Sequence, residues 1–283
     1  MQSADLSPAF TPLRIGPLTL RNRMIKSATN EGMTPSGVPS QALVGFHERV
    51  AAGGAALTTV AYCAVSPDGR TFVDQAQLDA PTVRQFRALT DAVRRHGAAA
   101  SAQITHGGCF TFLPSLSTKR PLSASGGFNK VGVMSGRFLK QAMTRDQMTS
   151  IADEFAQAAR RARAAMALQK LTEPKLGPSR ELYFLEHSRK VRAAVRMPLA
   201  YLGGVRSREN VALALREGFD AVAMARALVF EPDFVNRLRD GRAERSGCTS
   251  CNRCVVSMYT SGGTSCALQP PNDPAPNQMP AAG

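Results

Sequence analysis

The chain has 283 residues, of which 43% are hydrophobic and 20% are charged, as is typical of a globular protein with one large domain or two small ones. Its formal net charge of +14 favours an anionic partner such as a nucleotide, a phosphate or an acyl-CoA. Nucleic acid is disfavoured as that partner, because aromatic residues make up only 6%, Trp is absent and the basic residues are scattered. An arginine-rich, merely solvated surface is the simpler alternative.

No apolar run in the sequence is long enough to span a membrane, since the longest, at 55–65, is interrupted by threonines and a tyrosine. The first ten residues lack the basic and apolar regions of a signal peptide. We therefore expect a cytoplasmic protein without a membrane partner. Its six cysteines are then expected to be thiols, and clustered thiols indicate a metal site more than disulfides.

The first part of the chain alternates between strands and helices. In chain order we expect a hairpin at 14–21, a strand at 23–29, a helix at 40–54, a strand at 55–65, a helix at 81–97, a strand at 98–104 and, after a loop, a helix at 145–165. Thr144 and Gln147 form an N-cap box at the start of the last helix. The alternation predicts right-handed crossovers and a parallel sheet.

The alternation fails between 167 and 184, where the sequence has two prolines, several charges and no apolar strand. It resumes with a helix at 182–195, a strand at 198–204, a helix at 206–217 and a last strand that ends at Ala225-Arg226. We count five strands, whereas a closed (β/α)₈ barrel needs eight. The predicted fold class is α/β, an incomplete TIM (β/α)₈ barrel over residues 1–245.

Two strand ends late in the chain are candidates for a phosphate site. Gly203-Gly204 follows one strand and opens a helix, and Ala225-Arg226 follows the next strand. Backbone N–H groups at such a glycine turn form an anion cradle, which in barrels commonly lies after the last two strands. The alternative is an ordinary strand-to-helix turn with Arg226 as a surface cation.

Four separated motifs resemble one family of enzymes. They are RNRMIKSAT at 21–29, SAQITHGG at 101–108, YLGGVRSREN at 201–210 and AVAMARALVFEPDF at 221–234. Together they resemble the Old Yellow Enzyme class of NADH:flavin oxidoreductases, and its 2,4-dienoyl-CoA reductase-like branch in particular. These enzymes are FMN-binding (β/α)₈ barrels. The resemblance covers residues 10–165 and 181–268, in the same order.

The resemblance implies an FMN site at the strand ends. It places Ser27, Ala28 and Thr29 along the flavin ring, where Ala28 stands for a frequent proline, and it brings the backbone of Tyr62 to the ring. Gln103 would hydrogen-bond the pyrimidine edge of the flavin, although it could instead satisfy backbone at a strand end. The phosphate would be held by Gly203, Gly204, Ala225 and Arg226, with Ala225 in place of the usual glycine. His106 is expected to be structural, and His47, His96 and His187 are expected at the surface.

The resemblance also shows what the chain lacks. In the family, hydride passes from NAD(P)H to FMN and then to an electron-poor alkene or enoyl acceptor. A His/Asn or His/His pair on the fourth strand polarises the acceptor, and a basic residue on the fifth stabilises the reduced flavin. An internal deletion of the fourth to sixth strands explains the sequence after residue 165, so we assign no catalytic residue. The unpaired sheet edges would favour homo-oligomers or poor closure.

A cysteine-rich extension covers residues 246–268. Cys248, Cys251, Cys254 and Cys266 are spaced C-x₂-C-x₂-C-x₁₁-C, and four thiolates so spaced can converge on one metal. The dienoyl-CoA reductase-like enzymes bind a [4Fe–4S] cluster with a similar segment whose second gap is one residue longer. Iron–sulfur, zinc and no metal all stay open here. Cys63 and Cys109 are expected in the core or a loop, and residues 269–283 form a proline-rich tail expected to be disordered.

The sequence thus predicts an FMN-dependent NAD(P)H oxidoreductase that retains its cofactor contacts but lacks the strands that carry the catalytic pair. One alternative is a non-catalytic flavin- or metal-binding remnant. Another is a different phosphate-binding barrel.

Overall fold

The computed structural model describes residues 4–165, 167–168, 181–260 and 263–269. The predicted disordered tail lies outside these residues, except for Gln269. The strands are β1 (Leu13–Ile15), β2 (Leu18–Leu20), β3 (Met24–Asn30), β4 (Leu57–Ala64), β5 (Ala99–Thr105), β6 (Leu122–Ser123), β7 (Gly127–Phe128), β8 (Leu139–Ala142), β9 (Ala167–Leu168), β10 (Ala200–Leu202) and β11 (Ala221–Met224).

The helices are α1 (Gln41–Ala52), α2 (Val83–Arg95), α3 (Arg145–Ala165), α4 (Leu185–Ala194), α5 (Arg208–Arg216), α6 (Arg226–Phe230), α7 (Phe234–Arg239) and α8 (Arg253–Thr260), with short 3₁₀ turns at Ser7–Phe10, Pro35–Gly37 and Gly132–Ser135. Helices α1 to α5 begin and end close to the predicted positions, whereas α6, α7 and α8 were not predicted. The predicted N-cap box is present, because the Gln147 amide donates to the hydroxyl of Thr144 at 3.2 Å and the Thr144 amide donates to the Gln147 side chain at 3.0 Å. None of the helices in the described ranges is both long and apolar enough to cross a membrane.

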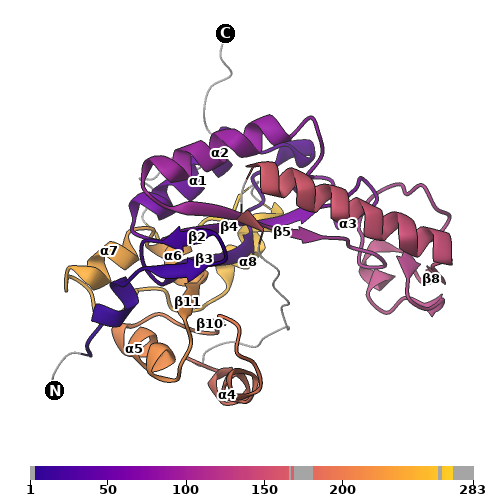
Figure 1. Cartoon of the computed structure of the whole chain (residues 1–283). Coiled ribbons are helices and arrows are strands. Elements are labelled where there is room, and N and C mark those ends of the chain that lie inside the picture. Colours follow the sequence, from indigo (N-terminus) through magenta and orange to yellow (C-terminus); the bar gives the residue numbers. More distant parts are fainter. Residues whose placement is uncertain (1–3, 166, 169–180, 261–262, 270–283) are drawn as a thin grey trace, which may run out of the picture.

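The central sheet has the strand order β10-β11-β3-β4-β5-β9, and every neighbouring pair is parallel. Helices α1 and α2 cover one side of it, and α3 runs from the sheet toward the small sheet that contains β8 (Figure 1). Among the described residues β9 and β10 do not pair with each other, so the sheet stays open. The fold is therefore an incomplete (β/α)₈ barrel, which confirms the predicted class.

Two details of the prediction were wrong. We expected only a Gly/Pro/Ser-rich loop at 107–143, where β6, β8 and β7 form a small sheet through backbone pairing that leaves no apolar pattern. We also expected no strand between residues 167 and 184. The two residues of β9 pair with Ser101 and Ala102 of β5, as a fourth strand of a barrel would. Two residues are too few to form a hydrophobic pattern, so this strand depends on its partner and leaves no signal in the sequence.

The core has two apolar clusters, one on each face of the sheet. The larger lies beneath α1 and α2 and includes Phe46, Phe86 and Leu89. The smaller joins Ile25 of β3 to the β1–β2 hairpin, which packs beneath the barrel. Ser27 follows Lys26 at a point where the register of β3 against β4 shifts, and its side chain is buried.

Candidate functional site

The sheet register brings the predicted site residues to one edge. Leu202 of β10 is level with Ala223 of β11, and Met224 of β11 is level with Lys26 of β3. Farther along the sheet Asn30 is level with Ala61, and Cys63 is level with Ile104. The residues predicted to contact FMN therefore lie at the carboxyl ends of five parallel strands, where (β/α) barrels place their ligands.

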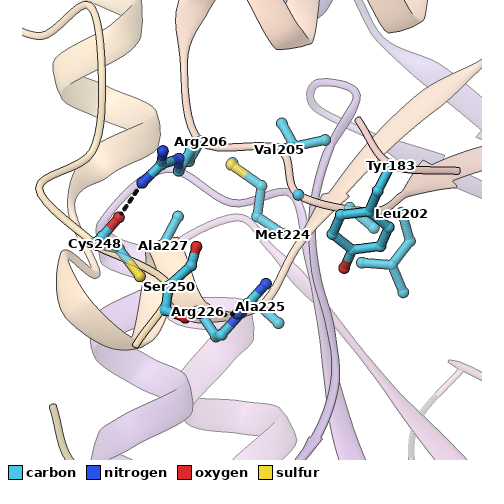
Figure 2. A pocket seen from close by; sticks show the side chains of 12 residues that line it. Tyr183, Leu202, Val205, Arg206, Met224, Ala225, Arg226, Ala227, Cys248 and Ser250 are labelled. Carbon is cyan, nitrogen blue, oxygen red and sulfur yellow. Dashed lines mark hydrogen bonds between the residues drawn. The ribbon is translucent and has the colours of Figure 1, made fainter. Parts of the chain in front are cut away.

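A small pocket of about 50 Å³, open to solvent, lies between the ends of β10 and β11. Figure 2 shows Tyr183 and Leu202 on one side of it, and Ala225, Arg226, Cys248 and Ser250 on the other. Three of the four residues predicted to hold a phosphate line this pocket, namely Gly204, Ala225 and Arg226. The fourth, Gly203, directly precedes Gly204 in the chain.

The two glycines have backbone conformations that other residues rarely adopt. Their φ angles are +152° for Gly203 and +71° for Gly204. A side chain at Gly203 would place its Cβ 3.0 Å from the ring of Phe184 and 3.1 Å from the hydroxyl of Tyr201. That hydroxyl donates to the Gly203 carbonyl at 3.1 Å, and burial raises its pKa to about 12. The turn is thus fixed by aromatic side chains beneath it.

The pocket contains two arginines in different electrostatic settings. Arg206 forms an ion pair with Glu181 at 2.6 Å, and Arg245 shares that carboxylate, so the charge of Arg206 is partly compensated. Arg226 donates to the side chain of Asn252 at 2.6 Å and to the Ser250 carbonyl at 3.5 Å, and both acceptors are neutral. Within the described ranges no carboxylate lies within 4.0 Å of Arg226. Its positive charge therefore remains available to an anion in the pocket.

The residues predicted to contact the flavin ring lie along the same edge but outside this pocket. Ser27 and Ala28 are buried, and Thr29 is partly buried with its hydroxyl bonded to Glu31 at 2.9 Å. Among the described residues the Ser27 hydroxyl has no hydrogen-bond partner, which is costly for a buried polar atom. Tyr62 packs edge to face with Phe72, with ring centroids 5.9 Å apart. Gln103 is partly buried on β5.

These observations fit FMN. A buried hydroxyl that no described residue bonds lies where the ring is expected. A glycine turn and an arginine that no described carboxylate pairs with lie where the phosphate is expected. Sequence reasoning missed Tyr183, Arg206 and Ser250 as pocket residues. Residue 183 and residues 248–252 reach the carboxyl edge of the sheet only in the folded chain. No sequence motif indicated that they would lie there.

The cysteine-rich segment lies against the pocket between β10 and β11, which Cys248 helps to line. All six cysteines are free thiols. Burial and the neighbouring thiols Cys248 and Cys266 raise the pKa of Cys254, and Arg226 opposes this rise. The four cysteines of this segment, Cys248, Cys251, Cys254 and Cys266, are thus near one another. Even so, among the described residues no three Cys, His, Asp or Glu side chains are arranged to hold a metal ion.

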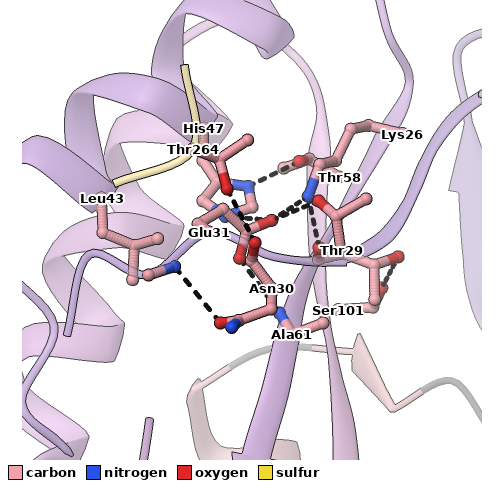
Figure 3. Close-up of polar contacts among 12 residues, drawn as sticks. Lys26, Thr29, Asn30, Glu31, Leu43, His47, Thr58, Ala61, Ser101 and Thr264 are labelled. Atoms are coloured by element: carbon pink, nitrogen blue, oxygen red, sulfur yellow. Dashed lines mark hydrogen bonds and ion pairs between the residues drawn. The ribbon is translucent and has the colours of Figure 1, made fainter. Parts of the chain in front are cut away.

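A buried polar cluster lies behind β3, on the side of α1 (Figure 3). Glu31 forms an ion pair with Lys26, and His47 lies 3.8 Å from the same carboxylate oxygen, with all three side chains at most 1% exposed. The expectation of a surface His47 was therefore wrong, because its ring turns inward to Thr58, at 2.6 Å. His187 is exposed, as predicted, and His96 is half-buried.

Burial and neighbouring charges set the pKa values of Glu31 and His47 in this cluster. Burial alone would raise the pKa of Glu31, but Lys26 and His47 outweigh it and hold that pKa below its usual range. Burial lowers the pKa of His47, against the effect of Glu31, so the folded protein favours the neutral imidazole. Cys63 lies in the core, and both burial and Glu31 raise the pKa of its thiol.

His106 lies at the end of β5, and its Nδ1 accepts a 3.0 Å hydrogen bond from the Gly108 amide. Burial lowers the pKa of His106, and the charges of Glu154 and Asp68 oppose this shift. The bond to Gly108 supports the structural role predicted for this histidine.

The open (β/α) sheet, with a pocket at the carboxyl ends of its last two strands, is the arrangement that ligand-binding (β/α) barrels use. Residues 8–168 match the NADH:flavin oxidoreductase / NADH oxidase family. The chain belongs to this family, and FMN and NAD(P)H are the family's cofactors.

Known proteins resemble both the sequence and the fold. The 4,4'-dithiodibutanoate disulfide reductase of Rhodococcus erythropolis is 30% identical over 393 residues, which covers 95% of this chain and 97% of that protein. A metal reductase of Desulforamulus reducens is 32% identical over 161 residues, 56% of this chain and 23% of that protein. The structure of morphinone reductase in complex with tetrahydroNAD is 18% identical, covers 90% of this chain and 96% of that one, and has a TM-score of 0.70.

The length of the first alignment bears on the predicted deletion. The alignment with the disulfide reductase extends over 393 residues, whereas this chain has 283. The reductase therefore contains a long stretch that this chain lacks. The family match ends at Leu168, close to where the strand and helix alternation fails. Both findings are consistent with an internal deletion.

Proposed function

We propose that this protein binds FMN at the carboxyl edge of its sheet and catalyses the reduction of a small electron acceptor by NAD(P)H. The observation that carries the proposal is the pocket shared by Gly204, Ala225 and Arg226, where no carboxylate of the described part of the chain compensates the arginine charge. In this proposal the terminal phosphate lies against the glycine turn and Arg226, since a guanidinium and backbone amides are the groups that hold phosphate well.

The proposed ring site extends from this pocket across β3, β4 and β5. The buried hydroxyl of Ser27 supports it, because a flavin heteroatom would give this group the partner it lacks among the described residues. Ala28, Thr29 and Tyr62 would complete the wall along the ring. Gln103 would contact the pyrimidine edge, since an amide can both donate and accept there.

Bound FMN would supply the redox chemistry, taking hydride from NAD(P)H and passing electrons to the acceptor. The chain's own contribution is to bind and orient the cofactor. Strand β9 contains only Ala167 and Leu168, so it carries neither the His/Asn nor the His/His pair that polarises a carbonyl. An electron-poor alkene or enoyl acceptor, which needs that pair, is therefore expected to react slowly.

An organic disulfide is the acceptor that the comparisons favour, since the relative aligned over nearly its whole length is a disulfide reductase. The balanced reaction consumes NAD(P)H, one proton and one disulfide and yields NAD(P)⁺ and two thiols. The S–S bond is broken, and no enolate forms that would need an oxyanion donor. The second candidate is a remnant that binds flavin or metal without turnover, and the lack of the pair on β9 favours it.

The experiment compares acceptors on the purified protein loaded with FMN. A yellow preparation with an absorption band at about 450 nm is expected, and NADPH oxidation is measured with an aliphatic dicarboxylate disulfide, with an enone and with no acceptor. The proposal predicts oxidation coupled to thiol release with the disulfide and slower oxidation with the enone. Bound flavin with no stimulated oxidation would favour the remnant, and absence of bound flavin would refute both.

The cysteine-rich segment has no part in the proposed reaction. We propose Cys248, Cys251, Cys254 and Cys266 as ligands of an iron–sulfur cluster or zinc, but the described side chains would have to move to form such a site. Iron, zinc and sulfide analysis of protein purified without oxygen tests this. Less than a tenth of a metal ion per chain would contradict it, and a Cys254→Ser variant is the control. A cytoplasmic location and self-association stay predictions.

A further inference from the structure

The orientation of Arg226 is controlled by a segment of the chain that lies outside the barrel. The Asn252 side chain accepts a 2.6 Å hydrogen bond from Nη1 of Arg226, and the carbonyl of Ser250 lies 3.5 Å from the same nitrogen. Both acceptors belong to the cysteine-rich segment. Because both are neutral, they fix the guanidinium without cancelling its charge, whereas Glu181 partly compensates the other arginine of the pocket.

The backbone of this segment is shaped to make that contact. Ser250 and Asn252 both have a φ of +60°, so the chain turns sharply on either side of Cys251. Asn is among the few residues other than glycine that adopt this left-handed conformation readily. An asparagine at 252 therefore combines a tolerated turn with a side-chain oxygen that reaches Arg226.

The segment is also held firmly against the pocket. Nη1 of Arg206 donates to the Cys248 carbonyl at 2.7 Å (Figure 2), and Cys248 is 8% exposed. Farther along, Thr264 is bonded to the end of β3. These contacts anchor the backbone that carries Asn252, so its amide is a fixed support for the arginine.

From these contacts we infer that Asn252 is a positioning residue for the phosphate of FMN, acting through Arg226. The inference rests on the proposed function, since it requires FMN in the pocket. It extends the cofactor site into the cysteine-rich segment. The opposite role, in which Asn252 occupies the place of the phosphate and competes for Arg226, predicts tighter FMN binding once the side chain is removed.

The test measures the affinities of FMN and of riboflavin, which lacks the phosphate, by flavin fluorescence titration. Asn252→Gly keeps the left-handed turn and removes the amide. We expect it to weaken FMN binding about five- to tenfold, as for one ordinary hydrogen bond, and to leave riboflavin binding unchanged. In an Arg226→Ala background, Asn252→Gly is expected to have no further effect on FMN, because the two act as one unit.

The matched control is Thr249→Gly, which adds the same backbone freedom at an exposed position of the same segment, where the lost side chain contacts Cys251 and makes no hydrogen bond to Arg226 among the described residues. It is expected to leave both affinities unchanged. The inference is overturned, while the proposed function stands, if Asn252→Gly tightens FMN binding, leaves FMN affinity unchanged or weakens the binding of both flavins equally. If the unaltered chain binds no FMN, or if Arg226→Ala leaves FMN affinity unchanged, the proposed function fails and the inference with it.

Discussion

The hydroxyl of Thr264 donates a 2.8 Å hydrogen bond to the carbonyl oxygen of Asn30, across 234 residues of sequence. The amide of Thr264 donates to the carbonyl of Glu31 at 2.6 Å. The cysteine-rich segment is thereby bonded to the end of β3, the strand whose end is expected to contact the flavin.

Thr264→Val removes the hydroxyl bond and keeps the shape of the side chain. Since a neutral hydrogen bond contributes about 1 kcal/mol, amide exchange at residues 263–269 is expected to accelerate about fivefold. Hydrogen–deuterium exchange measures it. Ser265→Ala, a change at the exposed neighbour, should leave exchange unaltered. Equal protection in the Val variant and the unaltered protein would show that the bond does not hold the segment.

Gly203→Ala tests the glycine turn beneath the phosphate pocket. The added Cβ meets Phe184 at 3.0 Å in a backbone conformation that alanine disfavours, so we expect the free energy of unfolding to fall by about 2 kcal/mol or more. Gly241→Ala is the control, because that glycine has a φ of +70° and open space around it. Urea unfolding compares the two variants. Similar losses would mean that the close packing at Gly203 contributes nothing.

Lys26→Met tests the buried ion pair behind β3. The change leaves the Glu31 carboxylate buried without its cation, which is expected to cost about 3–5 kcal/mol of unfolding free energy. The double variant Lys26→Met, Glu31→Gln removes the stranded charge and should recover part of that loss. The comparison is made by urea unfolding at pH 7. A double variant no more stable than Lys26→Met would contradict the assignment of an ion pair.

The lowered pKa of His47 predicts a loss of stability in mild acid. Its pKa is lowered in the folded protein, so below its ordinary value of 6.5 the unfolded chain binds more protons and stability falls as pH falls. Glu31, whose pKa is also lowered, adds to this loss only below its own ordinary value of 4.5. Between pH 8 and pH 5.5 the decline should therefore be smaller in His47→Gln than in the unaltered protein.

The exposed His187 provides the control for that measurement, since His187→Gln should retain the whole decline. The measurement is the free energy of unfolding of the two variants and of the unaltered protein at several pH values. If His47→Gln shows the same pH dependence as the unaltered protein, the buried imidazole does not titrate as described.

Much of this fold could be predicted from the sequence, because local patterns determine most of it. The apolar run at 55–65 and the N-cap box at Thr144 each appear where they were expected. The short strand β9 could not be found, since it exists only through its pairing with β5. His47 was misplaced for a similar reason, because a histidine on an amphipathic helix gives no sign of a buried partner 16 residues earlier.

The site was predictable in its residue types and less so in its surroundings. The glycine turn and Arg226 are marked by their positions after two strands, and they do line one pocket. That Asn252 and Ser250 reach Arg226 depends on two left-handed residues and on how the cysteine-rich segment packs. Sequence patterns do not encode such long-range contacts.

The central claim is that Arg226 and the Gly203-Gly204 turn hold the phosphate of FMN. Its most direct test is titration of the unaltered protein and of Arg226→Ala with FMN and with riboflavin. We predict that the variant binds FMN about 10- to 100-fold more weakly and riboflavin equally well, as for the loss of a charge-assisted contact to a phosphate. Equal FMN affinity in both proteins, or the same loss for both flavins, would contradict the claim.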